Sequence, residues 1–235
     1  MRLLVTRPEP DGERTATLLR AKGCDVLIAP LLRMLAVDAD IGDDPCDALA
    51  FTSANAVRAV AGHARLQWLV RHPAYAVGRR TAAAARAAGF DRVMSAEGDV
   101  AALAGLIKAN HGPGARLLHL AGEDRSGDLA ADLAVTGIAV RTVAVYRMDA
   151  VTEFPASARD RLMAGSIDGV LHFSQRSAVI YIDRASTAGI RDRALAPEHF
   201  CLSRQVAAPL RAAGAGRVRV ASRPSEADLI ALVPG

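Results

Sequence analysis

Short apolar runs alternate with amphipathic segments along the whole chain. The runs Leu3–Val5, Ala48–Phe51 and Ala74–Val77 are each followed by glycine, hydroxyl-bearing or charged residues. Segments with helical spacing of their apolar residues come next, and glycines such as Gly23 and Gly89 stand where these helices should end. Buried parallel strands connected by helices have this pattern. We therefore predict an α/β fold with parallel sheets.

One stretch of this pattern recurs later in the chain. Residues 47–57 combine an apolar run, a polar turn and the start of a helix, and residues 168–178 repeat this plan. The alignment places Ser174 on Ser53 and Arg176 on Asn55. The chain is therefore consistent with a duplication.

Two further similarities occur in the same order. The segment that begins at Leu117 resembles the one that begins at Leu3, and each has a glycine after its helix. A weaker similarity relates residues 78–83 to residues 203–208. Two kinds of segment therefore alternate along the chain, a strand–helix–strand unit and a three-strand unit with its helices.

One segment of each kind supplies five strands, the content of a flavodoxin-like, doubly wound sheet. Neighbouring segments could pair in tandem, or the first could pair with the last and the two middle ones with each other. Extended apolar tracts follow two of the strands and favour this swapped arrangement, because such tails can pair as a two-stranded antiparallel ribbon. We predict two flavodoxin-like domains with swapped connectivity: residues 1–34 and 149–235 in domain 1, 38–140 in domain 2, and linker strands at 30–37 and 141–148.

The composition is that of a globular protein. Of 235 residues, 51% are apolar and 23% are charged, which provides material for a buried core. No apolar run approaches the ~20 residues that a membrane helix needs, and the chain begins with a strand-like segment rather than a signal peptide. The cysteines, Cys24, Cys46 and Cys201, have no metal-ligand spacing. We expect a cytoplasmic protein without a membrane partner.

The formal net charge is +4, and the basic residues are scattered over many helices. We therefore expect no nucleic-acid partner. Nearly all of the basic residues are arginine, since Lys22 and Lys108 are the only lysines. Two explanations remain open: a compositional bias, which the abundant alanine shares, and a site for carboxylates, which arginine binds through paired hydrogen bonds.

The common catalytic motifs are missing from the sequence. No G-x-G-x-x-G follows a strand, and there is no P-loop, H-E-x-x-H or G-x-S-x-G motif. The six histidines have no ligand spacing, and we expect them at the surface or in supporting positions. The first turn, Thr6–Glu9, is not rich in glycine and hydroxyl residues, as the first turn of a flavin site would be. We therefore predict neither a metal nor a cofactor.

Polar residues gather where the predicted strands end. Ligands of open α/β sheets bind beyond the carboxyl ends of the strands, where helix N-termini present backbone N–H groups. Each residue alone is explained by a helix cap or a turn. Together, around a cleft between two domains, they predict a site for a polyanion. The candidate binding residues are Arg7, Ser53, Asn55, Gly78, Arg79, Thr81, Ser126, Ser174, Arg176, Ser203 and Arg204.

An ordered set of short motifs resembles the uroporphyrinogen-III synthase family. The motifs are Leu4–Pro8, Phe51–Val57, Ala76–Gly78, Thr81–Ala82, Val145–Arg147, Phe173–Ser174 and Pro224–Leu229, and they span nearly the whole chain. The resemblance implies two swapped flavodoxin-like domains with the active site in their cleft. It also implies cyclisation of the linear tetrapyrrole hydroxymethylbilane to uroporphyrinogen III, with inversion of ring D, loss of water and no cofactor.

The resemblance assigns roles to single residues. Tyr146 falls on the family's tyrosine that is proposed to assist departure of the hydroxyl group as water, although a purely structural tyrosine in the ribbon is an open alternative. Ser53, Thr81 and Ser174 match small hydroxyl positions of the family, whereas Val206 stands where some members have threonine. We expect Ser53 and Ser174 to face each other across one cleft.

Two alternatives to the synthase remain at this point. A non-catalytic binding module for a polycarboxylate metabolite would have the same two-domain shape, and a nucleic-acid protein is a more distant possibility. No heptad or exposed apolar tail demands a partner chain, so we expect a monomer.

Overall fold

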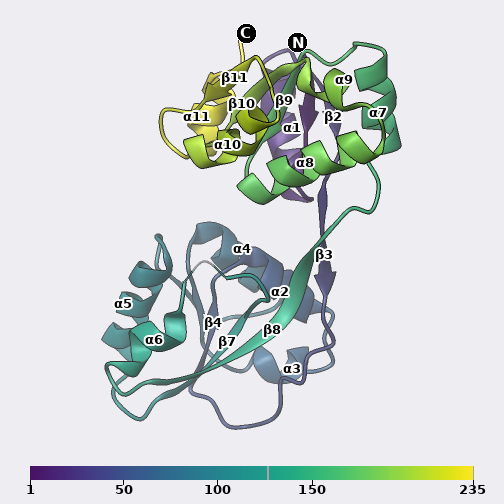
Figure 1. Cartoon of the computed structure of the whole chain (residues 1–235). Helices are drawn as coiled ribbons and strands as arrows, with labels where there is room; N and C mark the ends of the chain where they lie inside the picture. The colour runs from purple at the N-terminus through teal and green to yellow at the C-terminus, as the bar shows by residue number, and fades with distance from the viewer. Residues whose placement is uncertain (126, 235) are drawn as a thin grey trace. The chain divides into compact units, whose positions relative to one another are not determined.

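The computed structural model describes residues 1–125 and 127–234, and it contains two compact units (Figure 1). The first unit comprises Met1–Arg33 and Asp149–Gly235, and the second comprises Met34–Met148. Both divisions fall inside a strand, because β3 (Leu32–Ala36) and β8 (Ala139–Ala150) each run through one of them. Each unit is built on its own sheet, so the fold is α/β as predicted.

The sheet of the first unit combines strands from both ends of the chain. Its strand order is β11-β10-β9-β1-β2, and the neighbouring strands are parallel. The strands are β1 (Arg2–Val5), β2 (Asp25–Ile28), β9 (Gly169–His172), β10 (Glu198–Cys201) and β11 (Val218–Val220). The strands of the first segment therefore pair with those of the last segment.

Helices cover both faces of this sheet (Figure 1). On one face, Leu3 and Val5 pack against apolar residues of α1 (Asp11–Ala21) and α11 (Glu226–Ala231). On the other face, Tyr181 of α8 contacts the rings of His172 and His199. The remaining helices of this unit are α7 (Ala156–Met163), α8 (Gln175–Thr187), α9 (Arg191–Leu195) and α10 (Arg204–Ala212).

The sheet of the second unit has the order β3-β8-β7-β4-β5-β6. From β8 to β6 the neighbouring strands are parallel. The central strand β4 (Ala48–Phe51) is buried along its whole length, which explains its uninterrupted apolar run. Its neighbours are β7 (Arg116–Gly122) and β5 (Ala74–Ala76), and β6 (Val93–Ser95) lies at the edge.

Two layers of helices enclose the second sheet as well. Leu49 and Phe51 face a core shared with α2 (Ala54–Ala61), α3 (Leu66–Leu69) and α4 (Arg79–Ala87). Ala48 and Ala50 face the opposite core, which includes α5 (Val100–Asn110) and α6 (Leu129–Ala134). This alternation is the one that a doubly covered strand requires.

Glycines at matching positions of the sequence similarities adopt matching conformations. Gly23 and Gly137 have φ values of +82° and +75°, and Gly89 and Gly214 have +96° and +97°. This left-handed region is open to glycine at little cost, and it turns the chain after each preceding helix. The sequence similarities therefore mark equivalent turns.

Three histidines are buried inside the protein. His119, His172 and His199 are 2%, 0% and 0% exposed, so of the two expected locations, the surface and supporting positions, the surface is excluded for them. All three stand on strands and face covering helices. His119 Nε2 bonds to Thr52 Oγ1, and His172 Nε2 bonds to His199 Nδ1. Among the residues described, no helix is both long and apolar enough to span a bilayer.

Candidate functional site

The carboxyl ends of β4 and β5 lead directly into helices in the second unit. Ser53 is the N-cap of α2, where its Oγ accepts a hydrogen bond from the backbone N–H of Asn55 at 3.1 Å. Gly78 holds the same position before α4, with extended backbone at φ −163°. The first turns of both helices therefore present backbone N–H groups at one edge of the sheet.

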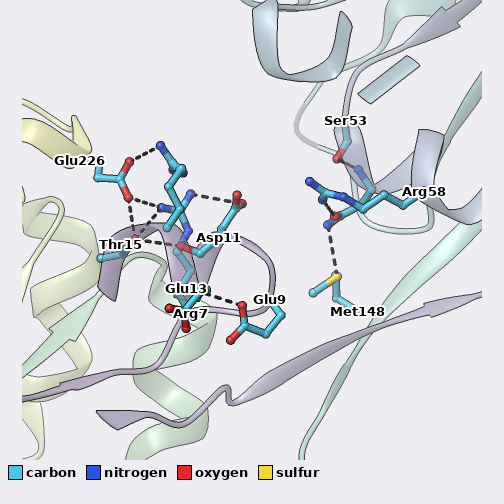
Figure 2. Close-up of polar contacts among 11 residues, drawn as sticks. Arg7, Glu9, Asp11, Glu13, Thr15, Ser53, Arg58, Met148 and Glu226 are labelled. Carbon is cyan, nitrogen blue, oxygen red and sulfur yellow. Dashed lines mark hydrogen bonds and ion pairs between the residues drawn. The ribbon is translucent and has the colours of Figure 1, made fainter. Parts of the chain in front are cut away.

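Asn55 is fixed by its own helix and by β8. Its Oδ1 accepts from Arg58 Nη1 at 2.6 Å, and its Nδ2 lies 3.9 Å from Met148 Sδ (Figure 2). Arg58 was not among the predicted residues. Its spacing of one helical turn from Asn55 is the signal that could have identified it, because side chains three positions apart are neighbours on a helix.

Arg79 and Thr81 differ in their access to ligands. Arg79 forms an ion pair with Glu97 at 2.7 Å, and its side chain is 82% exposed. Its guanidinium lowers the pKa of the Glu97 carboxyl through a hydrogen bond and its charge. Thr81 is only 5% exposed, so it contributes to the packing of α4. Of the two, only Arg79 has a side chain that can reorient towards a ligand.

Tyr146 lies against the last residue of β7. The ladder between β7 and β8 is irregular there and places Gly122 opposite Tyr146. A Cβ at Gly122 would lie 2.7 Å from Tyr146 Cζ and 2.9 Å from its Oη. Tyr146 is 9% exposed and belongs to the same core as Phe51. The absence of a side chain at position 122 therefore allows the phenol to reach the carboxyl edge of the sheet.

His119 lies beneath this edge and is neutral at pH 7. Its Nε2 is 3.1 Å from Thr52 Oγ1, just before the N-cap Ser53. Burial, with a smaller contribution from the charge of Arg125, lowers the pKa of His119 to about 4. It cannot provide a positive charge for a carboxylate at neutral pH, so the cationic donors at this edge are arginines.

Arg7 follows β1 in the first unit and sits in an ion-pair network. Its Nη1 lies 2.9 Å from Glu226 Oε1, and its Nη2 lies 3.4 Å from Asp11 Oδ2 (Figure 2). Its Cζ is 4.6 Å from the centroid of the Phe173 ring, a cation–π distance. The side chain is 18% exposed. Arg7 is thus held in one orientation at the carboxyl end of β1.

The helices after β9 and β10 begin with serine caps. Ser174 Oγ accepts from the N–H of Ser177 at 3.1 Å, and Ser203 Oγ accepts from the N–H of Val206 at 3.3 Å. Arg176 and Arg204 are exposed residues in the first turns of α8 and α10. Position 126, the remaining predicted contact, lies outside the described residues.

Two cavities lie away from these strand ends. One of about 270 Å³ is bordered by Cys46, Arg116 and Arg141 near the amino ends of β4, β7 and β8. Another of about 360 Å³ is bordered by Asp168 and Glu198 near the amino ends of β9 and β10. No predicted binding residue borders either cavity. Both cavities lie at the edge opposite to the one where open α/β sheets bind ligands.

The strand-end residues that the structure describes carry groups that bind anions. They provide guanidinium groups, hydroxyl groups, helix N-termini and one phenol. Within residues 1–125 and 127–234, no group of three or more histidine, cysteine or acidic residues is arranged to hold a metal ion. The chemistry available at these edges is carboxylate binding, with proton donation from the phenol of Tyr146.

Comparisons with known proteins point to one family. The profile of the family described as "Uroporphyrinogen-III synthase HemD" matches residues 13–231. Uroporphyrinogen-III synthetase from Helicobacter pylori shares the fold, with a TM-score of 0.65 and 18% identity over 99% of this chain and 98% of that one. A mutant uroporphyrinogen III synthase from Thermus thermophilus gives a TM-score of 0.51 and 17% identity, over 99% and 97% of the two chains. A search of curated proteins found no significant match.

Proposed function

The chain belongs to the uroporphyrinogen-III synthase family and functions in tetrapyrrole biosynthesis, and we propose that it cyclises hydroxymethylbilane to uroporphyrinogen III without a cofactor. The reaction inverts ring D and releases water. The observation that carries this proposal is the collection of positive charges and hydrogen-bond donors at the carboxyl ends of the strands, which can bind anions. Hydroxymethylbilane has a carboxylate on every pyrrole side chain, so it is a polyanion of the kind that these donors fit.

We propose that the strand-end residues bind these carboxylates. The arginines supply charge, and the capped first turns of α2, α4, α8 and α10 supply backbone N–H groups. A charge-assisted hydrogen bond contributes about 1.5–3 kcal/mol, so several weak contacts together can select one conformation of the substrate. The proposed binding residues are Arg7, Ser53, Asn55, Gly78, Arg79, Thr81, Ser126, Ser174, Arg176, Ser203 and Arg204.

The contribution of the protein to the reaction is mainly conformational. Spontaneous closure of hydroxymethylbilane gives the uninverted isomer, so the enzyme has to hold the chain with the substituted carbon of ring D close to the reacting methylene carbon. Tyr146 donates a proton to the departing hydroxyl as its C–O bond breaks, and water leaves. The methylene carbon then bonds to the substituted carbon of ring D, which gives a spiro intermediate. The contact of Tyr146 with Gly122 supports this role, because it keeps the phenol at the carboxyl edge of the sheet.

We also propose that both units are flavodoxin-like and are joined by an antiparallel ribbon of β3 and β8. The order β2-β1-β9-β10-β11 supports the first part for the first unit, because it is the 2-1-3-4-5 order of that fold. In the second unit the parallel strands have the order β6-β5-β4-β7-β8, so equivalent segments lie in the same spatial order, but the three-strand segment precedes the strand–helix–strand segment along the chain. Two backbone hydrogen bonds support the second part. The N–H of Val37 donates to the carbonyl oxygen of Val145 at 2.9 Å, and the N–H of Val151 donates to the carbonyl oxygen of Leu31 at 3.0 Å. The residue number rises on one strand as it falls on the other, which is the register of an antiparallel pair.

The protein is further proposed to act as a cytoplasmic monomer, with hydroxymethylbilane as its partner and with no nucleic acid or membrane surface involved. The scattered positions of the arginines support this part of the proposal, because nucleic-acid and membrane surfaces select clustered charge.

Turnover without a cofactor can be tested directly. Purified protein, treated with a chelator and desalted, is mixed with freshly generated hydroxymethylbilane, and consumption and products are followed by chromatography. We expect many turnovers per protein molecule. Tight binding of the tetrapyrrole without turnover would instead identify a binding module.

A further inference from the structure

Glu226 lies at the centre of a polar cluster near the carboxyl end of β1. Its Oε1 accepts from Arg7 Nη1 at 2.9 Å and from Thr15 Oγ1 at 2.6 Å, and its Oε2 lies 2.6 Å from Arg14 Nη1 (Figure 2). One carboxylate thus binds two arginines and a hydroxyl group. Contacts of this kind are shorter and stronger than those between neutral groups.

The hydroxyl of Thr15 is a fixed donor to this carboxylate. Its single proton can go to the backbone carbonyl of Asp11 at 3.0 Å or to Glu226 at 2.6 Å. The shorter contact to the charged acceptor is favoured. Thr15 is fully buried, so water does not compete for this bond. Helix α1 therefore holds Glu226 through both Thr15 and Arg14.

Arg7 is the group that this arrangement holds in place. The side chains of Arg7 and Glu226 are 18% and 19% exposed, so solvent and salt screen their ion pair less than one at the surface. The guanidinium is also stacked on Phe173, which directly precedes the α8 cap Ser174. The pair formed by Arg7 and Glu226 therefore connects α11 with the edge of the sheet where the proposed binding residues lie.

We propose that Glu226 is a positioning residue for Arg7, and that Arg7 in this orientation binds an acetate or propionate side chain of the substrate. The proposal rests on the proposed function. Two guanidinium groups share the carboxylate of Glu226, so loss of its negative charge leaves two like charges without their common partner, and the ion pair of Arg7 with Asp11, at 3.4 Å, is longer than the one that is lost. Arg7 then leaves its position over Phe173, and the substrate loses an ordered cationic contact.

The test is the steady-state kinetics of Glu226→Gln with hydroxymethylbilane. Glutamine keeps the size and a hydrogen-bonding oxygen but removes the charge. We expect KM to rise about tenfold and kcat to change by less than about twofold, because one charge-assisted contact in binding is lost. Asp228→Asn is the matched control: it removes one charge from the same helical turn, but Asp228 contacts Ser225 and Arg223 instead of Arg7. Its KM should stay unchanged.

A double-mutant cycle separates positioning from a general effect on folding. If Glu226 acts through Arg7, Glu226→Gln should raise KM no further in an Arg7→Ala background. The proposal would be overturned if Glu226→Gln had the KM of wild type. It would also be overturned if the rise of KM in the double variant equalled the product of the rises in the two single variants.

A second variant covers the case in which Glu226→Gln does not fold, as judged by circular dichroism. Thr15→Val removes the other donor to Oε1 and should raise KM about twofold to threefold, whereas an unchanged KM would overturn the proposal.

Failure of the positioning role and failure of the proposed function give different results. Wild-type protein that makes no uroporphyrinogen III contradicts the proposed function, whereas active wild type with a KM indifferent to Glu226 contradicts only the positioning role.

Discussion

Single residues at the strand ends were partly predictable from their types. Serine after a buried strand is a strong signal for a helix cap, and Ser53, Ser174 and Ser203 all cap helices. The pair of Arg7 and Glu226 could not be predicted, because Glu226 lies far away in the sequence and nothing local connects the two. Side chains that meet only through the fold leave no pattern of spacing.

The role of Tyr146 can be isolated by removing one atom. Tyr146→Phe keeps the ring in its core position but removes the phenolic proton donor, so kcat should fall by about 100-fold or more while the fold stays intact. Product formation and far-UV circular dichroism measure the two effects. A kcat close to that of wild type would leave Tyr146 as a structural residue of the ribbon.

Gly122 should be sensitive to a single methyl group. Gly122→Ala places a Cβ 2.7 Å from Tyr146 Cζ, so the ring has to move. We expect a loss of about 1–3 kcal/mol in the free energy of unfolding, from overpacking, together with a loss of activity. Urea unfolding and the cyclisation assay measure these changes.

Gly105→Ala is the matched control for Gly122. Position 105 lies inside α5, and apart from its chain neighbours and the backbone of this helix no atom lies within 4 Å of an added Cβ. The substitution should therefore stabilise the protein slightly and keep its activity. Equal behaviour of the two variants would contradict the importance that we attach to the contact between Tyr146 and Gly122.

At the scale of elements, the sequence predicted most strands and the longer helices. Buried strands have apolar runs that are easily recognised, and glycines mark helix ends because few other residues adopt positive φ. The start of a helix is set by its cap residue. Helices α2 and α4 begin at Ala54 and Arg79, directly after their caps Ser53 and Gly78. The short helices α3 and α9 have too few turns to show a period.

The buried histidines of β9 and β10 predict a dependence of stability on pH. His172 Nε2 and His199 Nδ1 are 3.1 Å apart. Burial lowers the pKa of His199 from 6.5 to about 4, and burial also lowers the pKa of His172, with a smaller effect from His199. Between pH 6.5 and 4 the unfolded chain binds more protons than the folded protein, so stability is complete above pH 6.5 and falls as the pH decreases.

Urea unfolding at pH 7.5 and pH 5 measures this effect. We expect each buried histidine to reduce the free energy of unfolding by about 1–2 kcal/mol at pH 5. His119 adds to the loss, because its pKa is also about 4. A free energy of unfolding that is equal at the two pH values would show that these rings are not neutral and buried as described.

At the scale of the whole molecule, the repeats in the sequence indicated which segments belong together. The strands of Met1–Arg33 pair with those of the last segment, while Met34–Met148 forms a unit between them. Repeats alone could not choose between tandem and swapped pairing. The choice depended on the apolar tracts at 30–37 and 141–148, which continue beyond the strands that precede them.

The second unit should fold by itself. The fragment Met34–Met148 contains a sheet with helices on both faces and two apolar cores, so its stability does not require the rest of the chain. We expect it to unfold cooperatively with heat, as followed by circular dichroism. A fragment without a cooperative transition would mean that the sheet of the second unit needs the segments of the first unit for its stability.

The isomer ratio of the product tests the central claim most directly. Hydroxymethylbilane closes spontaneously to the uninverted isomer, so the protein has to change which isomer is formed and not only how fast. Increasing amounts of purified wild-type protein are added to freshly generated hydroxymethylbilane, and the oxidised products are separated by chromatography. We expect uroporphyrinogen III to replace the uninverted isomer as the protein concentration rises. A product composition identical to that of the reaction without protein would contradict the proposed function.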